Sequence, residues 1–337
     1  MKIYEWLKRR KRPDKPGAGS VFGLLLLLAF SAVFVSGCAK ENTEHGLDGE
    51  EKLRVVTTIF PQYDFVRQTA GDKVDLKMLL KPGEESHSYE PTPKDIIDIQ
   101  NCDLFIYVGG ENDEWVEDIL DSVDRTHLRT LRLVDCVDTV EEEHVAGMKE
   151  ERHEEEEGAF DEHVWTSPKN AVRIVENITE ILCGEDPRNE EEFRQAAKVY
   201  EDKLLALDKE FQKTVQDSAR HTVLFGDRFP FRYFADAYGL DYYAAFPGCA
   251  SDTEPSAATM AYLINKVKEE NIPVVLKMEL SNDNIAKAIA EATGAEVKVF
   301  YSCHNITAGQ FRAGETYLSM MEKNVETLKE ALSDGIN

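Results

Sequence analysis

The chain has 337 residues, of which 42% are hydrophobic, and it carries a formal net charge of −25. This length gives room for about two domains, and the hydrophobic content can supply their cores, which excludes a disordered chain. A protein this acidic repels the phosphate backbone of nucleic acids, which excludes nucleic acid as a partner. The same negative charge would attract cations in general, which is only a weak indication of function.

The first 37 residues are typical of an export signal. A basic run, Lys8–Arg12, precedes an apolar run, Val21–Val35, and this is the order of the n-region and h-region of a signal peptide. The apolar run is shorter than the roughly 20 residues that a membrane-spanning anchor, the alternative interpretation, requires. Small residues lead directly to Cys38 and resemble a bacterial lipobox. We therefore expect a lipidated Cys38, a tether over residues 38–52, and an extracytoplasmic protein anchored to the cell membrane.

Beyond this tether, short apolar runs alternate with helical patterns. The predicted strands are Arg54–Thr58, Val74–Leu80, Leu104–Val108, Leu131–Val134, Thr222–Phe225, Tyr242–Phe246, Pro273–Met278 and Glu296–Phe300. The predicted helices include Gln62–Thr69, Pro93–Gln100, Trp115–Ser122, Ala257–Asn271 and Asn282–Thr293. This alternation predicts an α/β fold with mainly parallel sheets flanked by helices. Because four strands precede a long gap and four follow it, we expect two similar lobes, at residues 53–186 and 220–337.

The gap between the lobes, residues 187–219, has the pattern of one long helix. Its apolar residues recur at spacings of three and four: Phe193, Ala197, Tyr200, Leu204, Leu207, Phe211 and Val215. Roughly 30 helical residues would span about 45 Å. A coiled-coil dimerisation arm is the alternative, but the central position favours a helix that joins the lobes. Such a connection is stiff, so a large hinge closure is not expected.

An acidic, low-complexity stretch covers residues 141–157. Its charge density prevents a packed core, so we expect a solvated loop. His144 and His153 lie among nine acidic residues there. Loose collection of cations by this loop is one interpretation, and a simple solvated run is the other.

Three histidines occupy the loops where ligands collect in α/β folds. His87 lies in a turn-rich loop between a strand and a helix, and His304 directly follows a strand. His163 lies just ahead of a helix that begins at Pro168. Ligands of α/β sheets bind at loops outside the carboxyl ends of strands, and imidazole suits zinc and similar ions. Each histidine alone is more readily a surface hydrogen-bonding group, so spacing alone makes a metal site only a hypothesis.

A resemblance to a known family strengthens this hypothesis. The chain from Leu53 to about Leu332 is similar to the zinc- and manganese-binding receptors of metal ABC importers, whose two lobes are joined by one long helix. Ser86–Pro91 matches the family's first-ligand loop, and Asp161–Trp165 matches the second. Thr253–Ser256 and Glu279 fit the family's carboxy-terminal lobe. The acidic stretch stands where zinc-binding members carry a His-rich loop.

The resemblance weakens at the third and fourth ligand positions. The third falls on or beside Arg228, whose guanidinium cannot coordinate a metal, so Asp227 is the nearest candidate. The fourth, usually an Asp just after the last strand, is taken here by the Ser302–His304 segment. The resulting ligand prediction is His87, His163 and His304, with Asp227 as a fourth ligand and Glu254 in reserve.

Five cysteines remain beyond Cys38: Cys102, Cys136, Cys183, Cys249 and Cys303. Outside the cytosol disulfides persist, and an odd number leaves at least one thiol unpaired. The resemblance implies a disulfide between Cys249 and Cys303, with two buried thiols as the alternative. Cys102 with Cys136, expected at the starts of neighbouring strands, is a lesser candidate pair, which would leave Cys183 unpaired.

The function that the resemblance implies is metal capture without catalysis. We expect a monomeric receptor that binds Zn²⁺ between its lobes and delivers it to the permease of an ABC importer. Manganese prefers more oxygen ligands and would be favoured if both Asp227 and Glu254 coordinated the ion. Because protons compete for imidazole, affinity should fall as the pH drops through the histidine range.

Three alternative functions remain from the sequence. They are a manganese receptor of the same family, a surface adhesin lipoprotein and a metallohydrolase. Glu84, Glu85 and Glu162 lie near the predicted ligands and could serve a hydrolase as a general base. No hydrolase motif accompanies them, so an enzyme is not expected.

Overall fold

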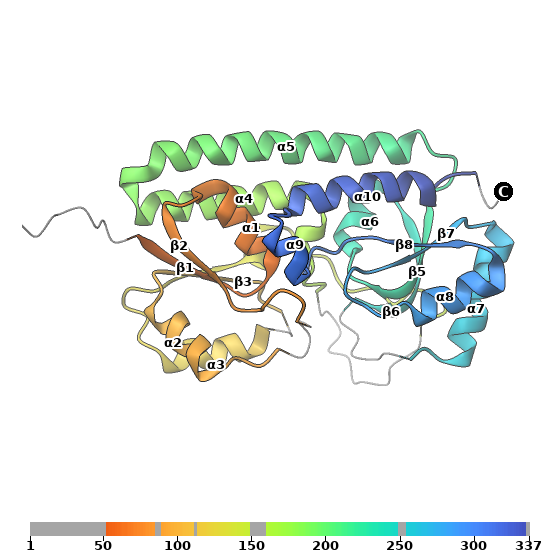
Figure 1. The fold of residues 1–337 in the computed structure, drawn as a ribbon, viewed down its shortest axis with the longest axis horizontal. Coiled ribbons are helices and arrows are strands. Elements are labelled where there is room, and N and C mark those ends of the chain that lie inside the picture. The colour runs from red at the N-terminus through yellow and green to blue at the C-terminus, as the bar shows by residue number, and fades with distance from the viewer. Residues whose placement is uncertain (1–51, 85–88, 111–112, 149–159, 249–253, 335–337) are drawn as a thin grey trace, which may run out of the picture. The chain divides into compact units, whose positions relative to one another are not determined.

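Two four-stranded sheets, in which all neighbouring strands are parallel, form the framework of the computed structural model (Figure 1). The structure describes residues 52–84, 89–110, 113–148, 160–248 and 254–334. The first sheet, in the order β2-β1-β3-β4, comprises β1 (Leu53–Thr57), β2 (Val74–Met78), β3 (Leu104–Tyr107) and β4 (Arg129–Arg132). The second, in the order β6-β5-β7-β8, comprises β5 (Thr222–Phe229), β6 (Asp241–Pro247), β7 (Val274–Lys277) and β8 (Glu296–Val299). The two sheets therefore repeat one strand order, and the predicted α/β fold is confirmed.

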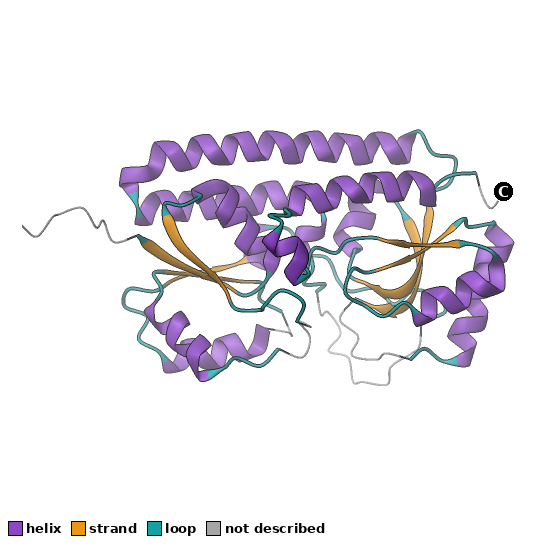
Figure 2. Cartoon of the chain, in the orientation of Figure 1, coloured by secondary structure: helices purple, strands orange, loops and turns teal. Residues whose placement is uncertain are grey.

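Helices flank both sheets (Figure 2). Those of the first lobe are α1 (Phe60–Ala70), α2 (Pro93–Asn101), α3 (Glu114–Ser122) and α4 (Pro168–Glu185). Those of the second lobe are α6 (Arg232–Tyr238), α7 (Ala257–Glu270), α8 (Asn284–Thr293), α9 (Ala308–Arg312) and α10 (Tyr317–Ala331). Side-chain caps begin several of them, as where Thr92 and Asp95 form a capping box at α2. None of the helices in the described ranges is both long and apolar enough to cross a membrane, and Val21–Val35 lies outside those ranges.

The long helix α5 (Glu190–Gln216) joins the lobes. It has 27 residues, or about 40 Å, and follows a short 3₁₀ turn, Pro187–Asn189. It contacts α1 and α4 of the first lobe and α6 and α10 of the second, running along both in Figure 1. The seven apolar residues that predicted this helix are all buried in one core cluster shared by both lobes. A common core along a stiff helix explains why the lobes are held together.

The structure differs from two of the predictions made from the sequence. The fourth strand lies at Arg129–Arg132, and the residues after it, Leu133–Cys136, form a 3₁₀ turn instead. Cys102 precedes the start of β3, whereas Cys136 follows the end of the parallel strand β4. These two residues therefore lie at opposite ends of two neighbouring parallel strands, and both are free buried thiols. The candidate disulfide between them is therefore wrong.

Candidate metal centre

His163 is fixed by a carboxylate within its own segment. The side chain is fully buried, and its Nδ1 lies 3.0 Å from Asp161 Oδ1, which also accepts a hydrogen bond from the His163 backbone amide at 2.7 Å. Burial alone would lower the pKa of His163, but the charge and hydrogen bond of Asp161, together with the negative charges of Glu162 and Glu142, outweigh burial and raise the pKa above the ordinary 6.5. A carboxylate on one ring nitrogen is the usual support of a metal-binding histidine. Nε2 is thereby the nitrogen suited to coordinate an ion.

Hydrogen bonds from the second lobe hold the segment that carries His163. Tyr233 in α6 donates from its hydroxyl to the Asp161 carbonyl at 2.6 Å. Trp165 Nε1 donates to the Ser302 carbonyl at 2.9 Å, and the Tyr317 hydroxyl donates to the Trp165 carbonyl at 2.7 Å. Because most of these groups are buried, the bonds fix this segment of the first lobe against the second.

His304 stands in a strained turn after β8. Cys303, immediately before it, has φ 59°, a left-handed conformation that costs a non-glycine residue about 1 kcal/mol or more. The turn is held by Glu279, whose carboxylate accepts hydrogen bonds from the Ser302 amide at 2.8 Å and the Ser302 hydroxyl at 2.9 Å. Burial raises the pKa of Glu279 to about 7, although these bonds lower it in part. Glu279 thus positions the loop on which His304 is presented.

The structure brings His163 and His304 together. Their ring centroids are 5.6 Å apart, and Trp165 packs 5.0 Å from the His304 ring. Two imidazoles bound tetrahedrally to one zinc ion through nitrogens at about 2.0–2.1 Å would have ring centroids about 5 Å apart. The observed separation is close to that value, so the two rings are near the spacing at which one ion could bind both.

Both histidines line a small pocket of about 40 Å³. Its other polar lining residues are Glu84, Arg228, Glu279, Ser281, Ser302 and Asn305. These residues come from both lobes, since Glu84 follows β2 and Glu279 follows β7. The pocket therefore lies where loops at the carboxyl ends of strands meet, as expected for ligand sites in α/β sheets.

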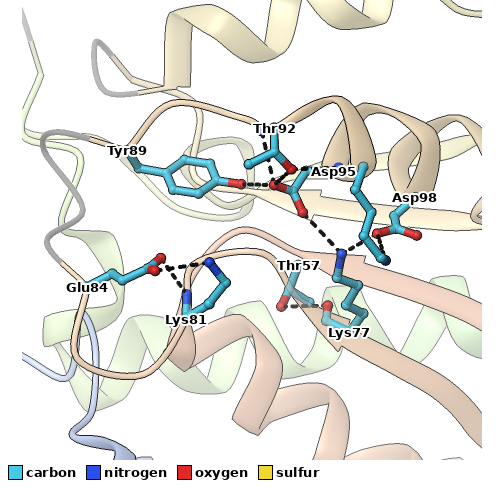
Figure 3. Close-up of polar contacts among 9 residues, drawn as sticks. Thr57, Lys77, Lys81, Glu84, Tyr89, Thr92, Asp95 and Asp98 are labelled. Atoms are coloured by element: carbon cyan, nitrogen blue, oxygen red, sulfur yellow. Dashed lines mark hydrogen bonds and ion pairs between the residues drawn. The ribbon is translucent and has the colours of Figure 1, made fainter.

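His87 lies outside the described residues, but both ends of its loop are fixed (Figure 3). On one side, Lys81 Nζ pairs with Glu84 Oε1 at 3.1 Å. On the other, the Tyr89 hydroxyl donates to Asp95 Oδ2 at 3.2 Å, and Lys77 Nζ pairs with Asp95 Oδ1 at 3.1 Å. These bonds anchor the chain before and after the predicted ligand.

The structure does not bring Asp227 to the two histidines. This residue lies within β5, and its Oδ2 accepts hydrogen bonds from the Met278 amide at 2.9 Å and from the Ser281 hydroxyl. It is buried and absent from the described lining of the pocket. The reason is a bulge in β5 just before Arg228, which directs Asp227 towards the turn after β7. Glu254 is exposed and is likewise absent from that lining.

Cys303 is a free and fully buried thiol. The resemblance implied a disulfide with Cys249, which lies outside the described residues. Cys183 is also a free buried thiol, at the end of α4.

Of two buried carboxyl groups near His304, Asp113 was missed from the sequence, and Glu162 was considered there only as a general base. Asp113 and Glu162 line a second cavity of about 20 Å³ that His304 also borders. Burial, with Glu162 nearby, raises the pKa of Asp113 to about 6, although hydrogen bonds from the Val108 and Gly109 amides oppose the shift. No sequence signal marks Asp113, because its burial depends on how α3 packs against the sheet.

Within the described ranges, no three His, Cys, Asp or Glu side chains form a complete metal-binding group. His163 and His304 supply two of the three predicted imidazoles, and the third is on the undescribed part of its loop. The described geometry is therefore two supported imidazoles facing one polar pocket.

Comparison with known proteins identifies the family. A model of the zinc-uptake complex component A family, described as periplasmic, matches residues 55–331. This chain belongs to that family. Its members are substrate-binding components of transport systems, and the fold and the resemblance predicted from the sequence are thereby confirmed.

Individual relatives support this assignment. The zinc-binding lipoprotein AdcA of Streptococcus pneumoniae is 34% identical over 312 residues, which cover 91% of this chain but only 60% of the relative. The high-affinity zinc uptake system protein ZnuA of Bacillus subtilis is 33% identical over 312 residues, 91% of this chain and 97% of the relative. The Zn(II)-bound ZnuA-like domain of S. pneumoniae AdcA has a TM-score of 0.70 at 32% identity, over 83% of this chain and 99% of that domain. The chain thus spans about three-fifths of the pneumococcal protein's length.

Proposed function

We propose that this chain is the receptor of a metal ABC importer and that it captures Zn²⁺ outside the cytoplasm. The observation that carries the proposal is the approach of the His163 and His304 rings to 5.6 Å at one pocket between loops of the two lobes. We assign His87 as the third ligand, because its loop is anchored beside this pocket at Glu84. Three neutral imidazoles favour zinc over manganese, which prefers more oxygen ligands.

Neither Asp227 nor Glu254 is retained as a ligand in this proposal. Both carboxylate oxygens of Asp227 accept hydrogen bonds, from the Arg228 amide and from the turn at Met278. Glu279 lies in the pocket lining, but its two oxygens accept from Ser302. We therefore assign both carboxylates to positioning the loops.

The proposed action is binding and delivery without turnover. The two supported imidazoles lie on loops fixed by buried hydrogen bonds between the lobes. The site would be largely preorganised, which reduces the cost of ordering it around an ion. Release would follow docking on the permease. We infer that the chain acts as a monomer, held to the membrane by a lipidated Cys38 after removal of residues 1–37.

Elemental analysis of the purified mature domain tests the ligand assignment. We expect about one zinc per chain, and loss of most of this zinc in His87→Ala, His163→Ala and His304→Ala. His127→Ala is the matched control, because His127 is exposed and lies on the turn before β4. Unchanged zinc content in all three ligand variants would refute the proposal.

Growth of a deletion strain separates the receptor from the alternatives. A receptor deletion should fail to grow in chelated medium and should be rescued by added zinc. Rescue by manganese alone would favour the manganese receptor, and growth without any metal requirement would favour an adhesin. Hydrolysis of ester or peptide substrates by the zinc-loaded protein would instead indicate a metallohydrolase.

A further inference from the structure

Trp165 contacts both of the histidines that line the proposed zinc pocket. The indole is fully buried, and its ring centroid lies 5.4 Å from that of His163 and 5.0 Å from that of His304. Its Nε1 donates to the carbonyl of Ser302, two residues before His304, at 2.9 Å. Because protein interiors are close-packed, a buried indole in contact with two rings cannot shift without displacing them. The position of Trp165 therefore helps to set the spacing of the two imidazoles.

Tyr317 holds Trp165 through the backbone. Tyr317 is the first residue of α10, and its hydroxyl donates to the Trp165 carbonyl at 2.7 Å. The side chain is fully buried, and its ring packs edge-on against Phe65 of α1, with ring centroids 5.0 Å apart. A buried carbonyl that lost this donor would have to move to another donor or remain unpaired. The Tyr317 hydroxyl thus fixes the 3₁₀ turn, Val164–Thr166, that directly follows His163.

Asp64 fixes Tyr317 from the other lobe. It lies in α1, is fully buried, and accepts a hydrogen bond through Oδ2 from the Tyr317 amide at 2.7 Å. The first amides of a helix have no partner within that helix, and the helix dipole favours an acidic side chain beside them. The other oxygen, Oδ1, accepts from Arg67 Nε at 2.9 Å, and Arg67 Nη2 donates to the Glu315 carbonyl at 2.8 Å. Asp64 and Arg67 therefore hold the start of α10 against α1.

These hydrogen bonds cross between the lobes at every step. Asp64 and Trp165 belong to the first lobe, whereas Tyr317 and Ser302 belong to the second. The bonds join Asp64 to Tyr317, then Tyr317 to Trp165, and then Trp165 to Ser302. All four residues are buried, and neither Asp64 nor Tyr317 is in the described lining of the pocket. This hydrogen-bonded series therefore connects the contact between α1 and α10 to the loop that carries His304.

We propose that Asp64 and Tyr317 are positioning residues for zinc, which act through Trp165 to hold His163 and His304 at the spacing that one ion needs. This inference rests on the proposed receptor function and adds to it two residues that do not touch the ion. Loss of a support behind a metal ligand usually lowers metal affinity about 10–100-fold. A contact that is merely structural would affect the stability of the fold and leave the affinity of the folded protein unchanged.

Tyr317→Phe tests this inference. The change removes the hydroxyl and keeps the ring that packs on Phe65. We expect the folded variant to bind zinc about ten-fold more weakly than the wild type, measured by competition with a chromophoric chelator. Tyr243→Phe is the matched control, because the Tyr243 hydroxyl also donates a 2.7 Å hydrogen bond within the second lobe, to Glu270 Oε1, away from the described pocket lining. Its zinc affinity should equal that of the wild type.

NMR of the histidine rings in the apo protein gives a second readout, which needs no zinc. Long-range ¹H–¹⁵N spectra report the tautomer and surroundings of each imidazole, and His163→Ala and His304→Ala assign the two signals. We expect both signals to shift in Tyr317→Phe and to stay in place in Tyr243→Phe.

Asp64→Asn tests whether Asp64 acts through Tyr317. Asparagine places an NH₂ group where one carboxylate oxygen accepted, so either the Arg67 or the Tyr317 donor loses its acceptor. We expect zinc affinity to fall about ten-fold here as well. Because the two residues act in series, the double variant should lose less affinity than the product of the two single losses. A loss equal to that product would overturn the series.

The two readouts separate failure of this inference from failure of the receptor function. Unchanged zinc affinity or unchanged ring signals in Tyr317→Phe, with only a lower melting temperature, would overturn the inference and leave the receptor function intact. Absence of zinc binding by the wild type would overturn the receptor function, and the ring signals of the apo protein would still show whether Tyr317 positions the histidines.

A milder variant decides the question if Tyr317→Phe and Asp64→Asn fold poorly. Arg67→Gln removes the guanidinium that joins Asp64 to the Glu315 carbonyl and leaves both of the other side chains in place. It should shift the same two ring signals and weaken zinc binding, whereas wild-type behaviour in both measurements would overturn the inference.

Discussion

The side chain of Asn305 is hydrogen-bonded to the backbone at Lys81 and Glu84. Its Nδ2 donates hydrogen bonds to the Glu84 carbonyl at 2.7 Å and to the Lys81 carbonyl at 3.0 Å. Asn305 is buried, and its Oδ1 accepts from the Ile306 amide at 2.8 Å. The loop that carries His304 in the second lobe is thereby fixed to the loop that leads to His87 in the first.

Asn305→Asp should disrupt this connection. The substitution keeps the shape but replaces two donors by an oxygen facing two carbonyls, which should destabilise the fold by about 1–3 kcal/mol. We expect zinc affinity to fall about 10–100-fold, the usual effect of losing an outer support of a metal ligand. The absorption spectrum of the cobalt-substituted protein should also change. Asn282→Asp, at an exposed position before α8, is the control. A lower melting temperature with an unchanged cobalt spectrum would mean that Asn305 is merely structural.

Gly248 lies against the His163 ring, where an added methyl group would be tightly packed. A Cβ atom there would lie 3.3 Å from His163 Cε1 and 3.1 Å from the Phe229 carbonyl oxygen. The backbone oxygen cannot easily move, so Gly248→Ala should displace the imidazole and weaken zinc binding about ten-fold. Calorimetric titration with zinc measures this loss.

Gly184→Ala is the matched control for the change at Gly248. A Cβ atom on Gly184, in α4, would contact nothing within 4 Å. Alanine should therefore stabilise the helix by about 0.5–1 kcal/mol and leave zinc binding unchanged. Equal zinc affinity in both alanine variants would contradict the close packing of Gly248 on His163.

Glu279→Gln should loosen the turn that presents His304. A glutamine can accept only one of the two hydrogen bonds from Ser302 and places an NH₂ group against the other donor. With the left-handed turn at Cys303 then poorly held, we expect zinc to dissociate about ten-fold faster or more. Stopped-flow transfer of zinc to a chelator measures the rate. Glu291→Gln, exposed on α8, should release zinc at the wild-type rate. An unchanged dissociation rate in Glu279→Gln would show that Glu279 does not position His304.

Asp95 should make the first lobe sensitive to acid. Burial raises the pKa of Asp95, but hydrogen bonds from Thr92 and the positive charge of Lys77 outweigh it and hold the pKa below the ordinary 3.8. A carboxyl whose pKa is lower in the folded state contributes its full stabilisation at pH values above its pKa in the unfolded state. It loses that contribution as the pH falls through its pKa in the folded state. Urea unfolding should therefore show a free energy that declines steeply below about pH 4.

Asp95→Asn isolates this contribution. It weakens the cap of α2 and the pair with Lys77, so we expect a loss of about 1–2 kcal/mol at pH 7 and a shallower decline in acid. Asp118→Asn, exposed on α3, provides the control. An unchanged acid slope in Asp95→Asn would assign the acid sensitivity to other carboxyl groups.

Local sequence patterns were sufficient to predict the helices and strands and their order along the chain. All eight strands and the long helix appear in the structure near their predicted residues, because alternating and three-to-four residue apolar spacings follow directly from strand and helix geometry. The boundaries differ where local pattern is a poor guide, as at β4 and at the extended end of β5. The segments around His87 and His163 were likewise recognisable, since they resemble the family's ligand loops over consecutive residues.

Which side chains come into contact could be seen only in the three-dimensional structure. The approach of His163 to His304, the bond from Asn305 to Glu84, and the support of the turn by Glu279 all join residues far apart in the chain. The direction of the Asp227 side chain depends on a register shift in β5, which no local sequence pattern indicates. Spacing along a chain specifies periodicity, whereas the direction of a side chain at a pocket depends on packing between elements that are distant in sequence.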